Sequence, residues 1–307
     1  MRILHAANEL GQGPRKVCLA IGFFDGVHLG HQQILRQTLT DARQHNGLAV
    51  VITFDQHPNT VVAPHRVPPL IYSLPKKLRV IESLGTDALL LIHFDKVFSR
   101  LSAEEFIRTL TREFAPTRCI CVGANFLFGH RRTGNVDLLR ALGKELGFTV
   151  HGLASVSLDG KAVSSTRIRE RILAGDLDAV SQMLGRSYAL CGKVVHGEGL
   201  GRQLGFPTAN IDCARLALPP GGVYAVQVQV EGRIYPGVLN IGTRPTIQQP
   251  VPQLRVEAHL LDFSGDLYDQ EVEIAFVEKL RDEQKFASTL ELRAQIARDI
   301  LEAKAKL

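Results

Sequence analysis

Apolar residues follow two different patterns along the chain, and the change between them falls near residue 185. In the first half, near-continuous apolar runs alternate with segments whose apolar residues recur at helical spacing. The runs lie at 17–21, 49–54, 88–93 and 119–123. Runs without polar alternation are typical of parallel strands that helices cover on both faces. The first half is therefore predicted to be a doubly wound parallel sheet.

Helix start and stop signals stand between the predicted strands. Pro75 follows Ser73 at a first helical turn, which is a favoured place for proline. Ser102 stands three residues before Glu105, the spacing of a capping box. Gly147 provides a stop for the helix that precedes it. These signals support helices as the connections between the strands.

Further along the chain, apolar and polar positions alternate with a period of two. Val226, Val228 and Val230 alternate with glutamines, and the stretches 254–260 and 272–276 repeat the pattern. This alternation is typical of strands with one buried face, and the Glu-Gly pair after Val230 predicts a tight turn. We expect an antiparallel sheet or a small β-barrel here.

The chain is predicted to end in a helix and to divide into two domains. Ser288 and Glu291 have the capping-box spacing at the start of that helix. We expect Leu290, Ile296, Ile300 and Leu301 on or near its apolar face. A chain of 307 residues has room for two domains of ordinary size, which we place at 1–185 and 186–307.

Charge and composition limit the classes of partner that we expect for the chain. The net charge of +5 and the pI near 9.0 suit anionic substrates. Nucleic acid is not predicted as a partner, because the basic residues are scattered and no basic run alternates with aromatics. No apolar run has the length of a membrane span, and no secretory signal is evident. A soluble cytoplasmic protein is expected, and self-association stays open.

The five cysteines are an odd number and lack paired metal-ligand spacing. Cys119 and Cys121 fall two residues apart on a predicted strand and are expected to face opposite sides. We therefore favour buried, reduced thiols over a disulfide or a zinc site.

The stretch 20–31 joins the end of a buried strand to the start of a helix. The first N–H groups of a helix have no internal partner and attract anions, and His28 and His31 add two imidazoles there. A glycine between them lets backbone approach a phosphate. The predicted nucleotide contacts are Gly22, Phe23, Phe24, Asp25 and Gly30.

Further candidates follow other predicted strands of the first half. Open parallel sheets bind ligands at the carboxyl ends of their strands. Asp55 and His57 follow one strand, and Asn125 follows another. The aromatic faces of Phe126 and Phe128 suit a planar ring. A later helix start carries hydroxyls and a guanidinium that suit a second phosphate site, namely Ser164, Ser165, Thr166 and Arg167.

The second half has one unusual stretch, 196–210. Four glycines within nine residues would let backbone wrap a phosphate. Thr208 and Asn210 offer oxygen ligands that face one way on an extended chain, which suits Mg²⁺. The predicted nucleotide contacts here are Gly197, Gly199, Gly201 and Arg202.

These motifs carry a resemblance to a known family. The His-x-Gly-His stretch resembles the signature of the nucleotidyltransferase superfamily in its flavin-adenylating form, and 197–210 resembles the riboflavin kinase signature. Supporting stretches occur in family order at 53–58, 123–134, 163–169, 222–225, 240–246, 257–261 and 280–286. Gln56 and Leu127 depart from the family's pattern, where proline and arginine are common. From about residue 20 to 297, the chain resembles the bacterial bifunctional riboflavin kinase/FAD synthetase family.

The resemblance implies a fold and two reactions. A Rossmann-like nucleotidyltransferase domain would adenylylate FMN to FAD with release of pyrophosphate. A riboflavin kinase-like barrel domain would phosphorylate riboflavin to FMN with ATP, and Mg²⁺ would serve as the cofactor at both sites.

The same resemblance implies roles for individual residues. His28, His31 and Arg167 would act in adenylyl transfer, and Glu257 would be the kinase base. Thr208 and Asn210 would bind Mg²⁺. The flavin-binding residues would be His57, Asn125, Phe126, Phe128 and Arg244.

Two other classes of function stay open. One is an enzyme with a single reaction whose second domain only senses flavin or ATP; it would have lost Glu257 or the histidine pair, and both are present. The other is a binding protein without activity, for example one associated with RNA, which only the high pI favours.

Overall fold

The computed structural model describes residues 1–11, 15–197, 199–213, 215–244 and 253–307, without the side chains at 243, 244 and 253. The chain forms two compact units. The first contains Met1–Pro69 and Leu74–Ser165, and the second contains Leu70–Ser73 and Thr166–Leu307. The boundary expected at 185/186 stays a prediction, and each unit is described by itself.

The first unit is built on a six-stranded sheet in the order β1-β4-β3-β2-β5-β6, with every neighbouring pair parallel. This confirms the predicted doubly wound parallel sheet. The strands are β1 Arg2–Leu4, β2 Val17–Ile21, β3 Leu48–Phe54, β4 Ala88–Ile92, β5 Thr117–Gly123 and β6 Thr149–Leu153. A separate hairpin pairs β7 Ser157–Leu158 with β8 Lys161–Ala162.

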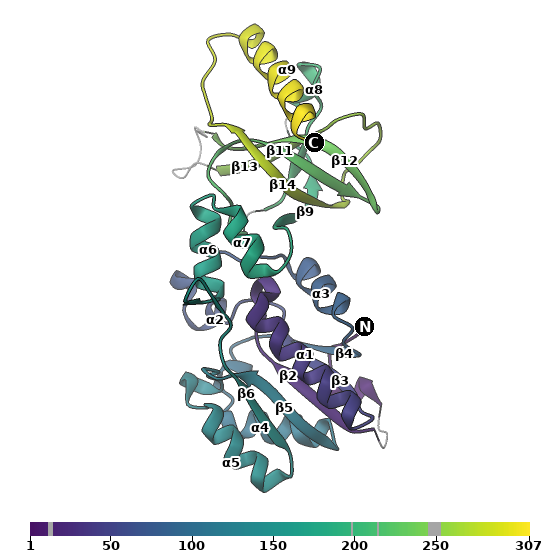
Figure 1. Cartoon of the computed structure of the whole chain (residues 1–307), viewed down its shortest axis with the longest axis vertical. Helices are drawn as coiled ribbons and strands as arrows, with labels where there is room; N and C mark the ends of the chain where they lie inside the picture. The colour runs from purple at the N-terminus through teal and green to yellow at the C-terminus, as the bar shows by residue number, and fades with distance from the viewer. Residues whose placement is uncertain (12–14, 198, 214, 245–252) are drawn as a thin grey trace. The chain divides into compact units, whose positions relative to one another are not determined.

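Helices cover both faces of this sheet. On one face, α1 contacts β2, β3 and β5 (Figure 1). On the other face, alternate residues of β2 such as Leu19 share a core with Ile107 and Leu139 of α4 and α5. The helices are α1 Leu29–Gln44, α2 Asn59–Val62, α3 Leu74–Ser83, α4 Ala103–Glu113 and α5 Val136–Leu146, with short 3₁₀ turns η1 Ala7–Leu10, η2 Asp25–Val27, η3 Pro64–Arg66, η4 Phe98–Arg100 and η5 His130–Arg132.

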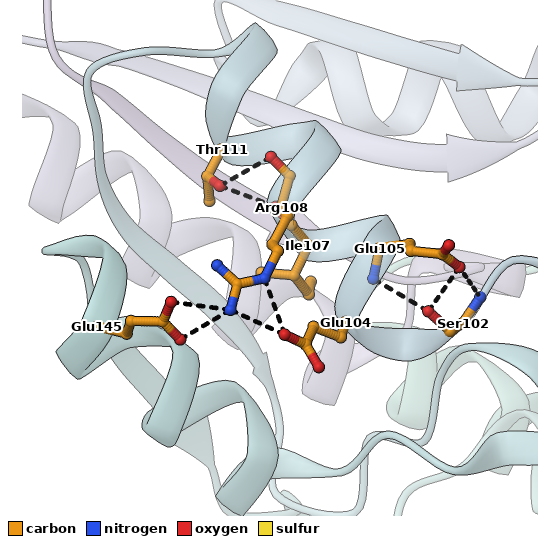
Figure 2. A network of polar contacts seen from close by, with 7 residues as sticks. All are labelled: Ser102, Glu104, Glu105, Ile107, Arg108, Thr111 and Glu145. Carbon is orange, nitrogen blue, oxygen red and sulfur yellow. Dashed lines mark hydrogen bonds and ion pairs between the residues drawn. The ribbon is translucent and has the colours of Figure 1, made fainter.

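The start of α4 confirms the predicted capping box (Figure 2). The Glu105 N–H donates to Oγ of Ser102 at 3.2 Å, and the Ser102 N–H donates to Oε2 of Glu105 at 3.0 Å. One turn later, Arg108 bridges Glu104 of the same helix and Glu145 of α5, at 2.9 and 2.8 Å. The cap fixes where α4 begins, and the bridge aligns it with α5.

All five cysteines are buried and free of disulfides, as predicted. The expectation that Cys119 and Cys121 face opposite sides is wrong. Residues two apart on a strand share a face, because side chains alternate with a period of two. Both thiols lie near Oδ2 of Asp41 on α1, at 3.5 and 3.4 Å.

The second unit contains a closed antiparallel barrel in the order β10-β13-β12-β11-β14-β9, which confirms the predicted small barrel. Its elements are α6 Ser165–Leu173 (which begins at the last residue of the first unit), α7 Leu177–Leu184, β9 Ala189–Val195, α8 Leu200–Gln203, β10 Ala209–Ile211, β11 Gly222–Val230, β12 Arg233–Arg244, β13 Gln253–Leu260, β14 Glu271–Arg281 and α9 Thr289–Lys306. Glu231 and Gly232 form the predicted turn with positive φ angles, as two-residue hairpin turns require.

The last helix, α9, contacts β11, β12 and β14 (Figure 1). Ser288 caps it as predicted. The predicted apolar face is wrong at Leu290 and Leu301, which are 75% and 69% exposed. The helix instead turns Ala303 and the carboxylate of Asp299 toward the barrel, and both are buried.

A buried ion pair fastens α9 to β14. Nε and Nη2 of Arg281 donate to the two carboxylate oxygens of Asp299 at 2.9 and 2.7 Å. Gln295 donates a further hydrogen bond to Asp299 at 2.8 Å. Bidentate guanidinium–carboxylate pairing fixes the angle as well as the distance between two groups. Asp299 therefore sets the orientation of this helix.

Among the described residues, no helix combines the length and apolar character needed to cross a membrane.

We predict that Asp299→Ala loosens α9. The substitution leaves the guanidinium of Arg281 without its carboxylate, and breaking a buried pair from one side costs about 3–5 kcal/mol. Denaturant unfolding, with hydrogen exchange of the α9 amides, measures the loss. Lys306→Ala is the control, because it removes an exposed ion pair with Glu278. Wild-type stability and wild-type exchange in Asp299→Ala would contradict this account.

Candidate functional sites

The turn after β2 is held in an unusual backbone conformation. Phe24 is buried and has a φ of 55°, a value that residues other than glycine rarely adopt. A Cβ at Gly22 would lie 2.9 Å from the Phe24 ring, so only glycine fits there. The carbonyl of Phe23 accepts a hydrogen bond from Oγ1 of Thr53 on β3, at 3.0 Å. The predicted nucleotide-contacting turn is thus fixed by packing and by the neighbouring strand.

Lys77 of α3 reinforces this turn from a buried position. Its ammonium group donates to the carbonyl oxygens of Phe54 and Phe23 at 2.8 and 3.3 Å and to Thr53 at 3.2 Å. It also lies 4.6 Å from the centroid of the Phe23 ring. Burial lowers its pKa to about 8. Sequence reasoning missed this residue because a lysine in an amphipathic helix ordinarily faces solvent.

The two histidines meet at the start of α1. His28 is the N-cap residue, and its Nδ1 accepts a hydrogen bond from the backbone N–H of His31 at 3.4 Å. Their rings stack, with centroids 3.6 Å apart. A Cβ at Gly30 would lie 3.3 Å from the His28 ring, so glycine gives this ring room. Because Nδ1 accepts, a neutral His28 carries its proton on Nε2 and can donate there.

The start of α6 reaches the same turn. Oγ of Ser165 donates to the carbonyl oxygen of Asp25 at 3.2 Å. Ser164 precedes this residue, and Thr166 and Arg167 follow it on the first turn of α6. The structure therefore places the predicted second phosphate-binding segment with its first residues against the His28 turn.

The predicted flavin-contacting residues of the first unit follow the carboxyl ends of β3 and β5. The ring of His57 meets the Phe23 ring edge-on, with centroids 4.9 Å apart. Asn125 is exposed and Phe126 is half-buried. Phe128 is only 7% exposed and belongs to the hydrophobic core, where it stacks on Phe126 at 5.2 Å. Phe128 thus packs against Phe126 from the core side. Asn125 and Phe126 are the accessible residues of this predicted flavin-contacting segment.

Asp55 has a partner that the sequence does not indicate. Its Oδ2 lies 2.5 Å from Nδ1 of His93, which follows β4. This hydrogen bond raises the pKa of His93. Burial of Asp55 opposes ionisation, but the hydrogen bond and charge of His93 together with hydrogen bonds from the backbone of Phe94 and Gln56 outweigh it, so the pKa of Asp55 is lowered. The pair ties the ends of β3 and β4 together at the edge where ligands bind.

A larger cavity of the first unit lies away from the histidines. It has a volume of about 1080 Å³ and borders η1, α4 and the strands beneath them, with Leu10, Leu90 and Phe106 in its wall. None of the predicted site residues is among the described residues that line it. We therefore assign it no part in the site.

The barrel holds a second site in a cavity of about 420 Å³. The strand register places Asn210 of β10 directly opposite Glu257 of β13, and Asn240 of β12 flanks Glu257 on the other side. Thr208 lines the same cavity. The predicted metal ligand Asn210 and the predicted base are therefore neighbours on adjacent strands, and the predicted ligand Thr208 lines the same cavity. Sequence reasoning did not single out Asn240, although it lies within a recognised motif.

Glycines make room for these side chains. A Cβ at Gly197 would collide with the amide of Asn210, and one at Gly201 would lie 3.0 Å from Oγ1 of Thr208. Gly199 starts α8 with a φ of 70° and also lines the cavity. The glycines thus leave space for the side chains of Asn210 and Thr208, in addition to letting backbone approach a phosphate.

Three predicted residues are not placed in this cavity, and Gly197 is one of them, since it lines a separate cavity beside Asn210. Arg202 is exposed on α8 and is not among the described residues that line it. The side chain of Arg244 lies outside the described part of the chain, so its flavin-binding role stays a prediction.

Comparisons with known proteins match each half of the chain to a family. The sequence matches the family model of FAD synthetase at residues 11–167 and that of riboflavin kinase at residues 184–307. It is 39% identical to the bifunctional riboflavin kinase/FMN adenylyltransferase of Escherichia coli K12, covering 99% of this chain and 97% of the relative. The Haemophilus influenzae protein of the same name is 40% identical, over 99% and 98%.

Among solved structures, one described as a macrolide-efflux protein from Streptococcus pneumoniae has a TM-score of 0.81 and 28% identity. The match covers 98% of each chain, so the likeness extends over both units. Two family models in the expected order and full-length identity of about 40% lead to one assignment. The chain belongs to the bifunctional riboflavin kinase/FMN adenylyltransferase family.

Proposed function

We propose that the chain makes FAD from riboflavin in two ATP-dependent reactions. The barrel unit transfers the γ-phosphoryl group of ATP to the terminal ribityl hydroxyl of riboflavin, which gives FMN and ADP. The first unit joins FMN to the AMP part of a second ATP, which gives FAD and pyrophosphate. The observation that carries the proposal is that each family-matched half holds its own cluster of chemically suited residues, around His28 in one and Glu257 in the other.

Adenylyl transfer requires alignment and charge stabilisation rather than a base. The attacking FMN phosphate is already an anion, so no proton has to be removed. Charge builds up on the α-phosphate and on the leaving pyrophosphate. Nε2–H of His28 and backbone N–H groups at the start of α1 can donate to those oxygens. His31 and Arg167 are the side chains that we assign to the distal phosphates.

Riboflavin phosphorylation requires the removal of a hydroxyl proton. Glu257 is half-buried in the barrel cavity and is the carboxylate we assign as the acceptor of that proton. Thr208 and Asn210 supply neutral oxygens that fit Mg²⁺, and the space left by Gly197 and Gly201 supports that role. A Mg²⁺ ion bound there would offset the negative charge of the phosphates during phosphoryl transfer.

The flavin is proposed to bind beside the nucleotide site, in the cytoplasm of the cell. His57, Asn125 and Phe126 lie at the ligand-binding edge of the first sheet and would contact FMN. Five buried free thiols fit a reducing compartment, which supports the cytoplasm as the place of action. The absence of nucleic acid among the partners and the option of self-association stay predictions.

His28→Ala is expected to lower FAD formation about 10²–10³-fold, because one preorganised donor to developing charge is removed. FMN formation from riboflavin is expected to continue, so FMN accumulates. Chromatography of the flavins in a reaction with riboflavin and ATP measures both. His65→Ala, an exposed histidine of the same unit, is the control. Equal loss of both products in a folded His28→Ala variant would contradict the division of labour.

Glu257→Gln is expected to act in the opposite way. Loss of a general base lowers phosphorylation of riboflavin by about 10²–10⁴-fold, while supplied FMN is still converted to FAD. The assay follows FMN from riboflavin and FAD from FMN in separate reactions. Glu278→Gln alters another carboxylate of the barrel and is the control. Normal phosphorylation in Glu257→Gln would remove that residue from its role.

Lys77→Met should reveal the buried ammonium through the pH dependence of stability. The folded protein releases the Lys77 proton near pH 8, whereas an unfolded lysine releases it near about 10.4. Wild type should therefore gain about 3 kcal/mol in unfolding free energy relative to Lys77→Met as pH rises across that interval. The gain is lost as pH falls through 8.

Urea unfolding at several alkaline pH values measures the difference between wild type and Lys77→Met. Lys144→Met, which alters an exposed helical lysine of the first unit, is the control. A difference between wild type and Lys77→Met that stays constant over the whole interval would refute the burial of this charge.

A further inference from the structure

A group of sulfur, nitrogen and oxygen side chains lies between α1 and the sheet, apart from the residues of the two proposed sites. Asp41 belongs to the end of α1, and Cys119 and Cys121 belong to β5. His151 of β6 is the register partner of Cys121, so its side chain shares the same face of the sheet. The thirteen residues from His28 to Asp41 span about 20 Å of helix, so this group is remote from the histidine pair.

One carboxylate oxygen is the centre of the group. Oδ2 of Asp41 lies 3.5 and 3.4 Å from the sulfur atoms of Cys119 and Cys121 and 3.4 Å from Nε2 of His151. The two sulfur atoms and a carboxylate oxygen of Asp41 all lie within 4.8 Å of one another. Tetrahedral zinc with its usual bond lengths separates sulfur or nitrogen from oxygen by roughly 3.4–3.6 Å. Each sulfur and the imidazole nitrogen therefore already lies at about the distance from the Asp41 oxygen that a shared zinc ion would set.

The surroundings of Asp41 also fit a metal ligand. The residue is 5% exposed, and a buried carboxylate needs compensation for its charge. Among the described residues, its ion-pair partner is His151. Gln37 donates to the other carboxylate oxygen at 2.9 Å, as outer partners of metal-ligating carboxylates do. The side chain of His151 is 35% exposed, which gives an ion a route of entry.

We propose that Asp41, Cys119, Cys121 and His151 bind one divalent transition-metal ion of the zinc class. Two thiolates and an imidazole favour such an ion over Mg²⁺, which prefers oxygen ligands. Binding releases the two thiol protons to solvent, and no electron is transferred. Four protein ligands close the coordination shell, so the ion is structural. It fastens the end of α1 to β5 and β6.

Cobalt titration of the full-length protein tests this site. Protein stripped with a chelator and kept reduced is titrated with Co²⁺ in the presence of excess Mg²⁺. We expect one equivalent to bind, with a thiolate-to-cobalt charge-transfer band, release of two protons and a higher melting temperature. Added Zn²⁺ should abolish the band. The oxygen ligands of the barrel cavity cannot produce this band, and none of these readouts depends on enzyme activity.

Variants identify the ligands. Cys121→Ser should lose the charge-transfer intensity of its thiolate, and His151→Ala should weaken Co²⁺ binding at least about tenfold. Gln37→Ala should weaken it about 10–100-fold, as loss of an outer partner does. Cys213→Ser removes a buried thiol of the second unit and should leave binding unchanged. His151 is half-exposed, so His151→Ala serves even where a core variant folds poorly.

Three results would overturn the proposal. The first is the absence of a thiolate band in wild type at stoichiometric Co²⁺. The second is an unchanged band in Cys121→Ser together with unchanged affinity in His151→Ala. The third is oxidation of Cys119 to a disulfide with Cys18, its register partner on β2, without any metal uptake by the reduced protein.

Discussion

The attachment of the β2–α1 turn to β3 is the constraint on which the first site depends. A single buried ammonium, that of Lys77, contacts carbonyl oxygens on both sides of this junction. Phe24 has a strained backbone conformation, and its ring packs so close to Gly22 that a side chain would not fit at residue 22. Because the turn leads directly into His28, its position decides where the first N–H groups of α1 point. Packing and desolvation beneath the turn thus fix the helix start at which we propose that phosphates bind.

In the barrel, the register between paired strands fixes the positions of the site residues. Asn210 and Glu257 face each other because β10 pairs with β13, and neither residue depends on a flexible loop for its position. Glycines beside them remove side-chain bulk where amide and hydroxyl oxygens must project into the cavity. At its open end, the Arg281–Asp299 pair holds α9 against β14. Both units therefore place their proposed site residues on regular elements or directly at the ends of such elements, which keeps donor and acceptor geometry fixed.

The sequence predicts the fold well where patterns are local. Parallel strands, caps and the hairpin turn each follow from a few adjacent residues, whereas β1, with three residues, is too short to show a pattern. Tertiary partners explain the failures. The burial of Lys77 depends on carbonyls distant in sequence, and α9 docks through Asp299 rather than through Leu301. Motifs identified Asn210 and Glu257 separately, but only the barrel register makes them neighbours. The shared face of Cys119 and Cys121 follows from strand period alone and was predictable.

The central claim is that one chain carries both reactions, each with its own residues. The most direct measurement is a time course with purified protein, riboflavin, ATP and Mg²⁺, in which the flavins are separated by chromatography. The account predicts that FMN appears first and that FAD follows at its expense, with pyrophosphate released in proportion to FAD. A reaction in which riboflavin yields no FMN, or in which supplied FMN yields no FAD, would contradict it.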